Sequence, residues 1–235
     1  MQFFSEFIFT LLILFFSITS LTGIGYLTAT ILKFNSDELI FYYTFFGLAI
    51  SIPILEIIHF FYPINIHVSF TIFILGTLLF FLLKNKYIES FQLPKSKITC
   101  TFFVILFLFW LFKSMDSITN SDSAFYHISF IKWINEFPLV GGLGNLIVHF
   151  ANNHSWFLFV SLLGFSPIIE NSYSIAGFLI LILSICLIFT NRNKIPYPNI
   201  LLPILVVTII FNTSRLSSPS PDLAINIFII IIFFY

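Results

Sequence analysis

The titratable residues of this chain are concentrated in one polar stretch, Asp116 to Ser155, which lies between long apolar runs. It contains three of the ten acidic residues and three of the five histidines. Because ionisable groups are costly in an apolar chain, their concentration in one loop indicates that function is located there. Asp122 lies near the start of this polar loop. A carboxylate facing outward at this position can act as a general base toward an acceptor hydroxyl.

A purely structural role is equally open for Asp122. Asn120 and Ser121 are good N-cap residues, which places Asp122 in the first turn of a helix that runs to about Phe137. There its charge complements the helix dipole, an effect of about 0.3–1 kcal/mol. His127 follows five residues later, about 140° around an ideal helix, so the two side chains stack only if the first turn is unwound. A single histidine is also more often a hydrogen-bonding core residue than a catalyst.

The predicted helix has an apolar stripe at spacings of three residues, and we expect it to lie along the membrane surface. The stripe consists of Phe125, Ile128, Ile131 and Ile134.

The histidines of the polar loop do not have the spacing of a dedicated metal site. With Asp122, the trio His127, His149 and His154 invites a metal hypothesis, but no pair has the i, i+4 spacing of an H-E-x-x-H site. We therefore predict no metal ligands and leave the cofactor unknown, a divalent metal included. The sequence also contains no G-x-S-x-G, P-loop or C-x-x-C motif, which excludes the enzyme classes that depend on them.

Three further ionisable residues lie in or beside apolar runs. Glu56 and His59 stand three residues apart after Pro53. We interpret them as a structural pair or as groups that reach the interface, with a proton or ion path as the alternative. Asp222 follows Ser220 and Pro221, a sequence typical of a helix start. Alternatively, Asp222 provides a second carboxylate at the same membrane face as Asp122, and such a pair would suit glycosyl transfer.

Composition identifies a membrane protein. The chain is 59% hydrophobic and 9% charged, whereas a soluble domain has roughly 25% charged residues. Ten basic and ten acidic residues give no net charge, so nucleic acid is not an expected partner. Cys100 and Cys186 fall in apolar runs near the predicted cytoplasmic face, where a disulfide is not expected.

The apolar runs predict an all-α, polytopic transmembrane helical bundle, because a bilayer core of about 30 Å needs about 20 helical residues. The predicted helices are 7–32, 39–62, 68–83, 98–115, 174–190, 195–212 and 223–235. The last run is too short to cross, so we expect a chain truncated at its C-terminus. The run 155–169 is short and contains Gly164 and Pro167, and we expect it to lie in or dip into the outer leaflet.

Lysine and arginine bias orients the chain with Lys84 to Lys97 in the cytoplasm. The N-terminus and the polar loop are then on the non-cytoplasmic side, and seven of the ten basic residues are inside. This predicts a multi-pass protein of the cell (inner) membrane. We divide it into residues 1–97, with three transmembrane helices and a basic inner loop, and residues 98–235, which hold the polar loop 116–155.

The second region resembles the N-terminal part of GT-C-fold membrane glycosyltransferases, and in particular a bacterial branch with a D-x-x-x-YH motif. The elements that carry the resemblance are Asp122-Ser-Ala-Phe-Tyr126-His127, Gly142-Leu-Gly-Asn145-Leu146, Asn152-Asn153-His154-Ser155-Trp156 and Ser218-Pro-Ser-Pro-Asp222. The usual double acidic pair is Asp122-Ser123 here.

The resemblance implies transfer of a sugar from a polyprenyl-phosphate donor to a cell-envelope glycan or lipid on the non-cytoplasmic face. The expected partners are thus membrane lipid and a polyprenyl-phosphate-linked sugar. Asp122 is the predicted catalytic residue. The predicted substrate-binding residues are Tyr126, His127, Lys132, Asn152, His154 and Asp222.

Two other functions remain open. A transporter or polysaccharide export component without catalytic activity would depend on Glu56 and His59. A polysaccharide polymerase or ligase would need arginines in its outer loops, and only Arg215 is present there, which counts against that class.

Overall fold

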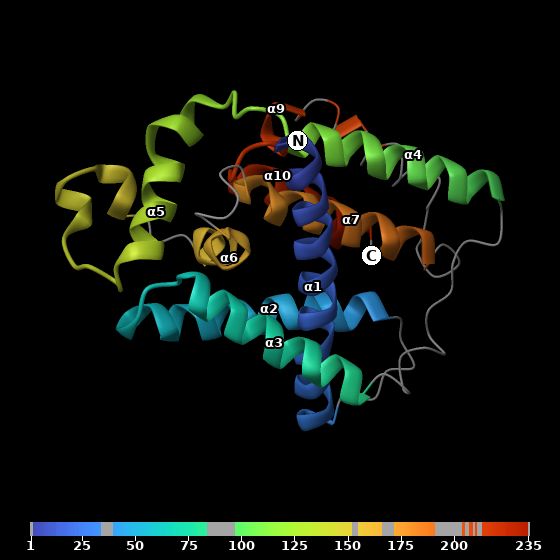
Figure 1. The fold of residues 1–235 in the computed structure, drawn as a ribbon, viewed down its shortest axis with the longest axis horizontal. Helices are drawn as coiled ribbons and strands as arrows, with labels where there is room; N and C mark the ends of the chain where they lie inside the picture. The colour runs from blue at the N-terminus through green and yellow to red at the C-terminus, as the bar shows by residue number, and fades with distance from the viewer. Residues whose placement is uncertain are drawn as a thin grey trace.

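The computed structural model shows an all-α protein (Figure 1). It describes residues 2–33, 40–83, 97–151, 155–165, 172–190, 204, 207–208, 210 and 213–234, and no strand occurs among them. The longer helices are α1 (Gln2–Ile31), α2 (Ile40–Phe61), α3 (Ile66–Leu83), α4 (Lys97–Ser114), α5 (Ile128–Glu136), α6 (Ser155–Leu163), α7 (Ile175–Thr190) and α10 (Pro221–Phe234). Short turns are η3 (Ser123–His127), η4 (Leu143–Asn145), η5 (Val148–Ala151), η6 (Ser172–Ser174) and α9 (Thr213–Leu216).

Three helices are long and apolar enough to cross a membrane, and they are the first three of the chain. Shorter apolar segments are found within α4, α7 and α10. The predicted helices 7–32, 39–62, 68–83, 98–115, 174–190 and 223–235 therefore agree with observed helices to within a few residues, except that α1 starts at Gln2. The predicted helix 195–212 and the basic loop before Lys97 lie largely outside the described residues.

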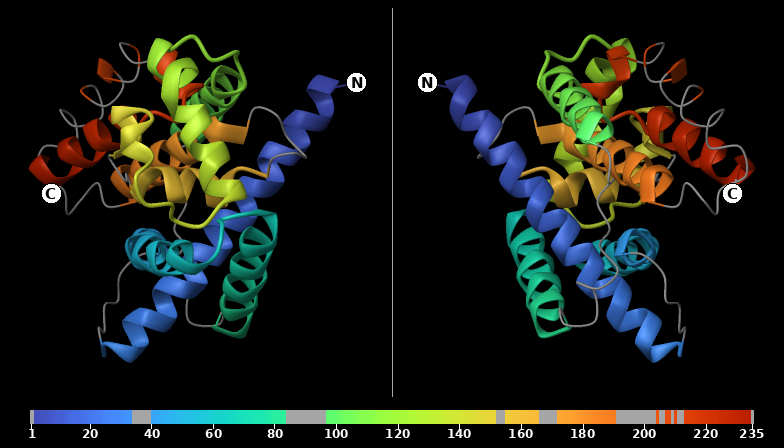
Figure 2. Two further views of the ribbon diagram at one scale, coloured as in Figure 1. Left: turned by 90° about the vertical axis from the view of Figure 1, so that its left-hand side faces the viewer. Right: turned by 90° about the vertical axis from the view of Figure 1, so that its right-hand side faces the viewer.

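Helix α1 runs across both α2 and α3 (Figures 1 and 2). Small residues allow this close approach, as is common between apolar helices. A Cβ atom on Gly25 would lie 1.8 Å from the Tyr43 carbonyl oxygen of α2, and one on Gly23 would lie 2.1 Å from the Gly76 carbonyl oxygen of α3. The backbones of these helices are thus in contact, and a side chain at either glycine would push them apart.

Hydroxyl groups add hydrogen bonds to this crossing. Thr22 Oγ1 lies 2.7 Å from Thr44 Oγ1 of α2, and the Ser20 hydroxyl donates to the Ile72 carbonyl of α3 at 3.1 Å. Because lipid offers no alternative partner for a hydroxyl, such bonds help to hold apolar helices together.

Helix α6 forms the centre of the core. It has nine residues, and all of those from Phe157 to Leu163 are buried. Its length, about 14 Å, is too short to cross a bilayer, which is consistent with the predicted non-spanning segment. In Figure 1 it is seen end-on, crosswise to α2 and α3. A helix that is apolar on all sides is covered by protein on all sides, and here α2, α3, α5 and α7 all contact it.

Candidate functional site

Two polar segments that are distant in sequence meet at one place. They are the polar loop and the serine-proline linker, Thr213 to Asp222. The Ser123 and Ser218 hydroxyls are hydrogen-bonded to each other although 95 residues separate them. The Trp156 indole N–H donates to the Pro219 carbonyl at 2.9 Å. The linker is therefore held against both ends of the polar loop.

Asp122 is exposed at the point where the helix of the polar loop begins. The Asn120 side-chain oxygen accepts a hydrogen bond from the Asp122 backbone N–H at 3.0 Å, so the predicted helix start at Asn120 is confirmed. The following turn, η3, is a π-helix, and the Ile128 N–H bonds to the Ser123 carbonyl. Such wider turns within α-helices occur frequently at functional sites.

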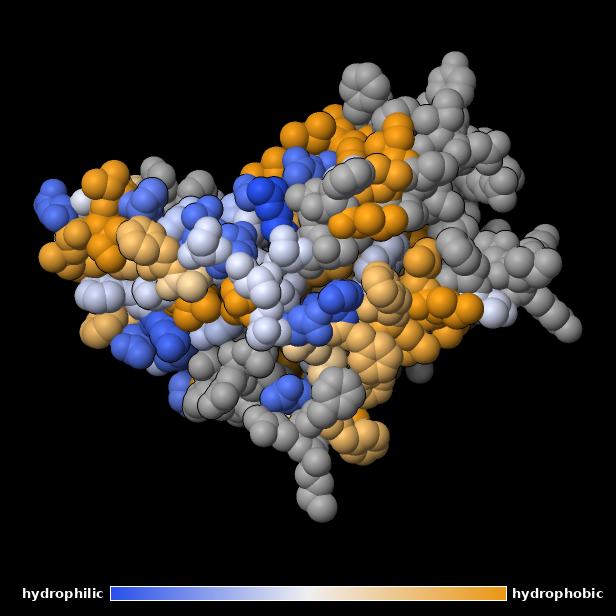
Figure 3. Space-filling view, turned by 90° about the horizontal axis from the view of Figure 1, so that it is seen from above, coloured by the Kyte–Doolittle hydropathy of each residue, from blue (hydrophilic) through white to orange (hydrophobic). Residues whose placement is uncertain are grey.

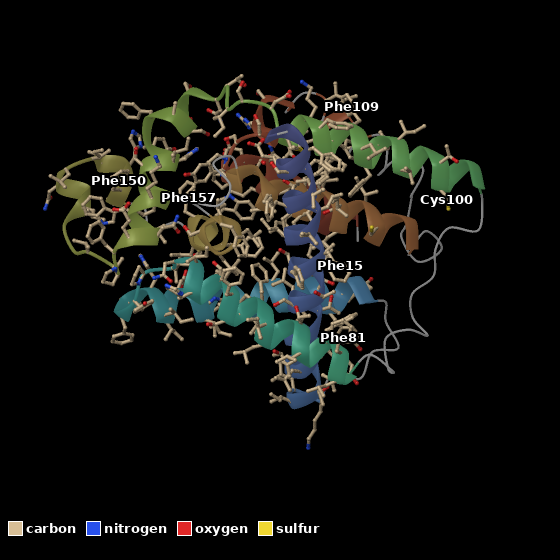
Figure 4. All side chains as sticks on the ribbon, in the orientation of Figure 1. Phe15, Phe81, Cys100, Phe109, Phe150 and Phe157 are labelled. Carbon is tan, nitrogen blue, oxygen red and sulfur yellow. The ribbon has the colours of Figure 1, made fainter. Side chains whose placement is uncertain are left out.

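The predicted apolar stripe is wrong at Phe125, because the π-turn changes the register of the helix. Ile131 and Ile134 are fully buried as predicted, whereas Phe125 is 68% exposed. Because a π-turn holds more residues than an α-turn, residues before it are rotated relative to those after it. The apolar face of α5 also packs on protein rather than on lipid. The Phe130 ring contacts Phe150 of the polar loop and Phe157 of α6, with ring centroids 5.2 and 5.7 Å away. Figure 4 labels Phe150 and Phe157 near α5.

His127 is hydrogen-bonded to a serine. Its Nδ1 atom lies 3.1 Å from the Ser123 hydroxyl, which also bonds Ser218. All three side chains are buried. Substrate binding by His127 stays a prediction. The geometry places it in a buried hydrogen-bonded chain that joins the polar loop to the linker.

Tyr126 lies at the surface end of this arrangement. Its ring stacks on His149, with centroids 4.5 Å apart and an interplanar angle of 14°. Burial, followed by the negative charges of Asp122 and Asp222, raises the pKa of the Tyr126 hydroxyl. Asp122 and Asp222 therefore both lie near enough to Tyr126 for their charges to affect its hydroxyl.

Asp222 lies in the first turn of α10, immediately after Pro221. The Ser220 hydroxyl accepts a hydrogen bond from the Asp222 N–H at 3.3 Å, so the predicted helix start is confirmed. The Asp222 carboxylate also faces Arg215, at 3.4 Å from its Nη1 atom. Both side chains are partly exposed, which makes this a weak ion pair that a ligand can rearrange.

The remaining predicted residues are placed less directly. Lys132 is exposed on α5, and no contact with the other predicted site residues is seen in the described part of the chain. Asn152 and His154 lie outside the described residues. Within the described ranges, no three His, Cys, Asp or Glu side chains gather into a metal-binding group.

Two serines of this arrangement were not predicted from the sequence, and neither was the stacking of one histidine. Ser123 and Ser218 flank the motif residues Asp122 and Pro219, and their pairing has no sequence signal at a separation of 95 residues. His149 was considered only as a metal ligand, whereas it stacks on Tyr126. An available signal for Ser123 was its i, i+4 spacing to His127, which places the two on one helical face.

Glu56 and His59 do not form the predicted pair. The Glu56 carboxylate accepts a hydrogen bond from the Ser155 hydroxyl at the start of α6. His59 is buried, and its Nε2 atom has no hydrogen-bond partner among the described residues. Glu56 thus ties α2 to the end of the polar loop.

Hydrophilic residues are concentrated over the left and centre of the face in Figure 3, and hydrophobic residues cover much of its right side. An apolar cavity lies elsewhere, between α1, α3 and the residue Phe165. It measures about 550 Å³ and includes none of the predicted site residues. Its lining includes Phe9, Leu12, Phe16, Phe70, Phe81 and Phe165.

Comparison with known proteins places the chain in a family. Neither the curated proteins nor the solved structures contain a match. One family model matches residues 7–235, and this match runs across the boundary predicted between residues 97 and 98. The chain therefore belongs to the family described as Domain of unknown function (DUF8201).

Proposed function

We propose that the protein is an integral membrane glycosyltransferase. It transfers a sugar from a polyprenyl-phosphate donor to a cell-envelope glycan or lipid on the non-cytoplasmic face. The observation that carries this proposal is that the segments bearing Asp122 and Asp222 are joined by the hydrogen bond between Ser123 and Ser218, and that both carboxylates are near enough to raise the pKa of the Tyr126 hydroxyl. Two acidic groups at one site are suited to glycosyl transfer, in which one carboxylate removes a proton and the other orients the reactants.

Asp122 is the general base of the proposed reaction. The acceptor hydroxyl oxygen forms a bond to the anomeric carbon of the sugar while its proton passes to the Asp122 carboxylate. The bond between the anomeric carbon and the phosphate oxygen breaks, and polyprenyl phosphate leaves with the electron pair. The exposed position of Asp122 supports this role, because an acceptor can approach it from solvent.

The surroundings offer groups that match the two halves of the donor. Arg215 provides a cation beside Asp222, and a guanidinium binds phosphate in a two-pronged geometry. The stacked rings of Tyr126 and His149 provide an aromatic surface next to the carboxylates. The apolar cavity between α1 and α3 has walls suited to a hydrocarbon chain.

The proposal is tested with purified protein in proteoliposomes that contain radiolabelled polyprenyl-phosphate hexoses, supplied singly, together with an envelope glycan extract. Consumption of one donor with appearance of labelled product supports the proposal. If the protein consumes none of the donors while properly folded, the proposed activity is wrong. Folding is checked in the same samples by the intrinsic fluorescence of the tryptophans.

A second candidate is a transporter or export component without catalytic activity. It is favoured by the buried His59, whose Nε2 atom has no partner in the described residues, and by the nearby half-buried Glu56. Ionisable groups within apolar helices commonly belong to ion or substrate paths. This candidate predicts a flux across the membrane that Glu56→Gln abolishes and Asp122→Asn leaves intact.

A further inference from the structure

The segment that follows α5 exposes apolar side chains beside the end of a candidate membrane span. Phe137, Leu139 and Val140 are all exposed. The face of α5 that we expected to contact the membrane is buried against α6. Any contact between the polar loop and the bilayer therefore involves other residues, and residues 137–140 lie next to the end of α2.

Two backbone hydrogen bonds fix the position of this segment. The Leu139 N–H donates to the His59 carbonyl at 2.8 Å, and the Ile64 N–H donates to the Ile134 carbonyl at 3.0 Å. Both bonds join the region around the end of α5 to the last turn of α2 or the turn after it. In Figure 1 the chain after α5 passes beside the ends of α2 and α3. The depth of residues 137–140 is thus set by the end of α2.

The end of α2 is itself apolar and exposed. Phe60, Phe61 and Tyr62 are exposed, with Phe61 at 82%. Only 33% of the apolar part of α2 is buried inside the protein, which leaves most of its surface free to face lipid. The exposed residues after α5 continue that lipid-facing surface at the position where the span ends.

We propose that these six side chains, Phe60, Phe61, Tyr62, Phe137, Leu139 and Val140, form an apolar collar that inserts into the interfacial layer of the bilayer. The partner is a phospholipid surface. Aromatic residues at the end of a span are typical of this layer, because their rings are apolar while their edges tolerate water. Insertion anchors the polar loop at a fixed depth, independently of any catalytic activity.

The collar is tested by fluorescence quenching in proteoliposomes of phosphatidylethanolamine and phosphatidylglycerol. Cys100 and Cys186 are first replaced by Ser and Ala, and single cysteines are then introduced and labelled with an environment-sensitive dye. Position 140 is the test, the exposed Ile57 inside the candidate span is the reference inside lipid, and the exposed Ser121 is the aqueous control. Quenchers are lipids that carry a nitroxide near the head of the acyl chain, and iodide in the water.

We expect the label at position 140 to behave like the label at position 57, with a blue-shifted emission, strong quenching by the nitroxide lipids and little quenching by iodide. The label at position 121 should show the opposite pattern. A label at 140 that is quenched by iodide and not by the lipids overturns the collar. Shielding that disappears when the protein is diluted in lipid also overturns it, because a second copy of the chain is then the occupant. A label at position 137 repeats the test if the variant at 140 does not fold.

Discussion

The hydroxyl of Ser218 is hydrogen-bonded to the hydroxyl of Ser123, so the serine-proline linker is locked to the polar loop inside the protein. Ser218 also accepts a hydrogen bond from the Ser220 N–H at 3.1 Å. Since Ser123 is next to Asp122 and Ser220 is two residues before Asp222, this contact fixes one carboxylate relative to the other.

Replacing Ser218 by Ala should destabilise the protein by about 1–3 kcal/mol, because buried polar groups lose their partner. The measurement is the midpoint of thermal unfolding in detergent. Ser214→Ala is the matched control, because Ser214 is exposed on the same linker, and it should leave the midpoint unchanged. Equal midpoints for both variants would show that the contact between the two segments is not formed.

Replacing Gly25 by Ala should disrupt the crossing of α1 over α2. The added Cβ would lie 1.8 Å from a backbone oxygen of α2, and backbone cannot rotate away as a side chain can. Overpacking costs typically about 1–3 kcal/mol, and a loss at or above the top of this range is expected. The yield of folded, monodisperse protein and its unfolding midpoint measure the effect.

Gly141→Ala is the control for that substitution, because nothing lies within 4 Å of the position of its Cβ. If Gly25→Ala is tolerated as well as Gly141→Ala, then the two helices do not make the close contact described here.

The titration of Tyr126 should respond to the charges of both Asp122 and Asp222. Because the folded protein raises the pKa of this hydroxyl above its ordinary value of about 10, the folded state holds the proton more tightly than the unfolded state. The resulting stability is present below pH of about 10 and is lost as the pH rises through the raised pKa. Asp122→Asn removes one negative charge and should therefore lower the pKa of Tyr126.

The measurement is phenolate absorbance against pH, with Tyr126→Phe subtracted to isolate one residue. Asp116→Asn serves as a control, since the negative charges that raise the pKa of Tyr126 are those of Asp122 and Asp222. An unchanged Tyr126 titration in Asp122→Asn would place that carboxylate away from the hydroxyl.

The helices could be predicted from sequence, because the length of an apolar run alone decides whether it can form a span. The helix starts before Asp122 and at Asp222 could be predicted too, since Asn120 and Pro221 act locally. The exposure of Phe125 could not, because the π-turn changes the register between it and Ile128. Sequence patterns also could not predict two hydrogen bonds, the one between Ser123 and Ser218 and the one from Ser155 to Glu56. They depend on how the helices pack, and no local pattern encodes a partner so distant in sequence.

The central claim is that the Asp122 carboxylate takes a proton from the sugar acceptor. The rate of sugar transfer by the Asp122→Asn variant tests this claim most directly. A general base contributes roughly 10²–10⁴-fold to a rate, so the rate of transfer should fall by at least about 100-fold in this variant. Asp116→Asn, an exposed aspartate of the same loop that is paired with Lys113, should retain the wild-type rate. Full activity in a normally expressed and folded Asp122→Asn protein would contradict the account.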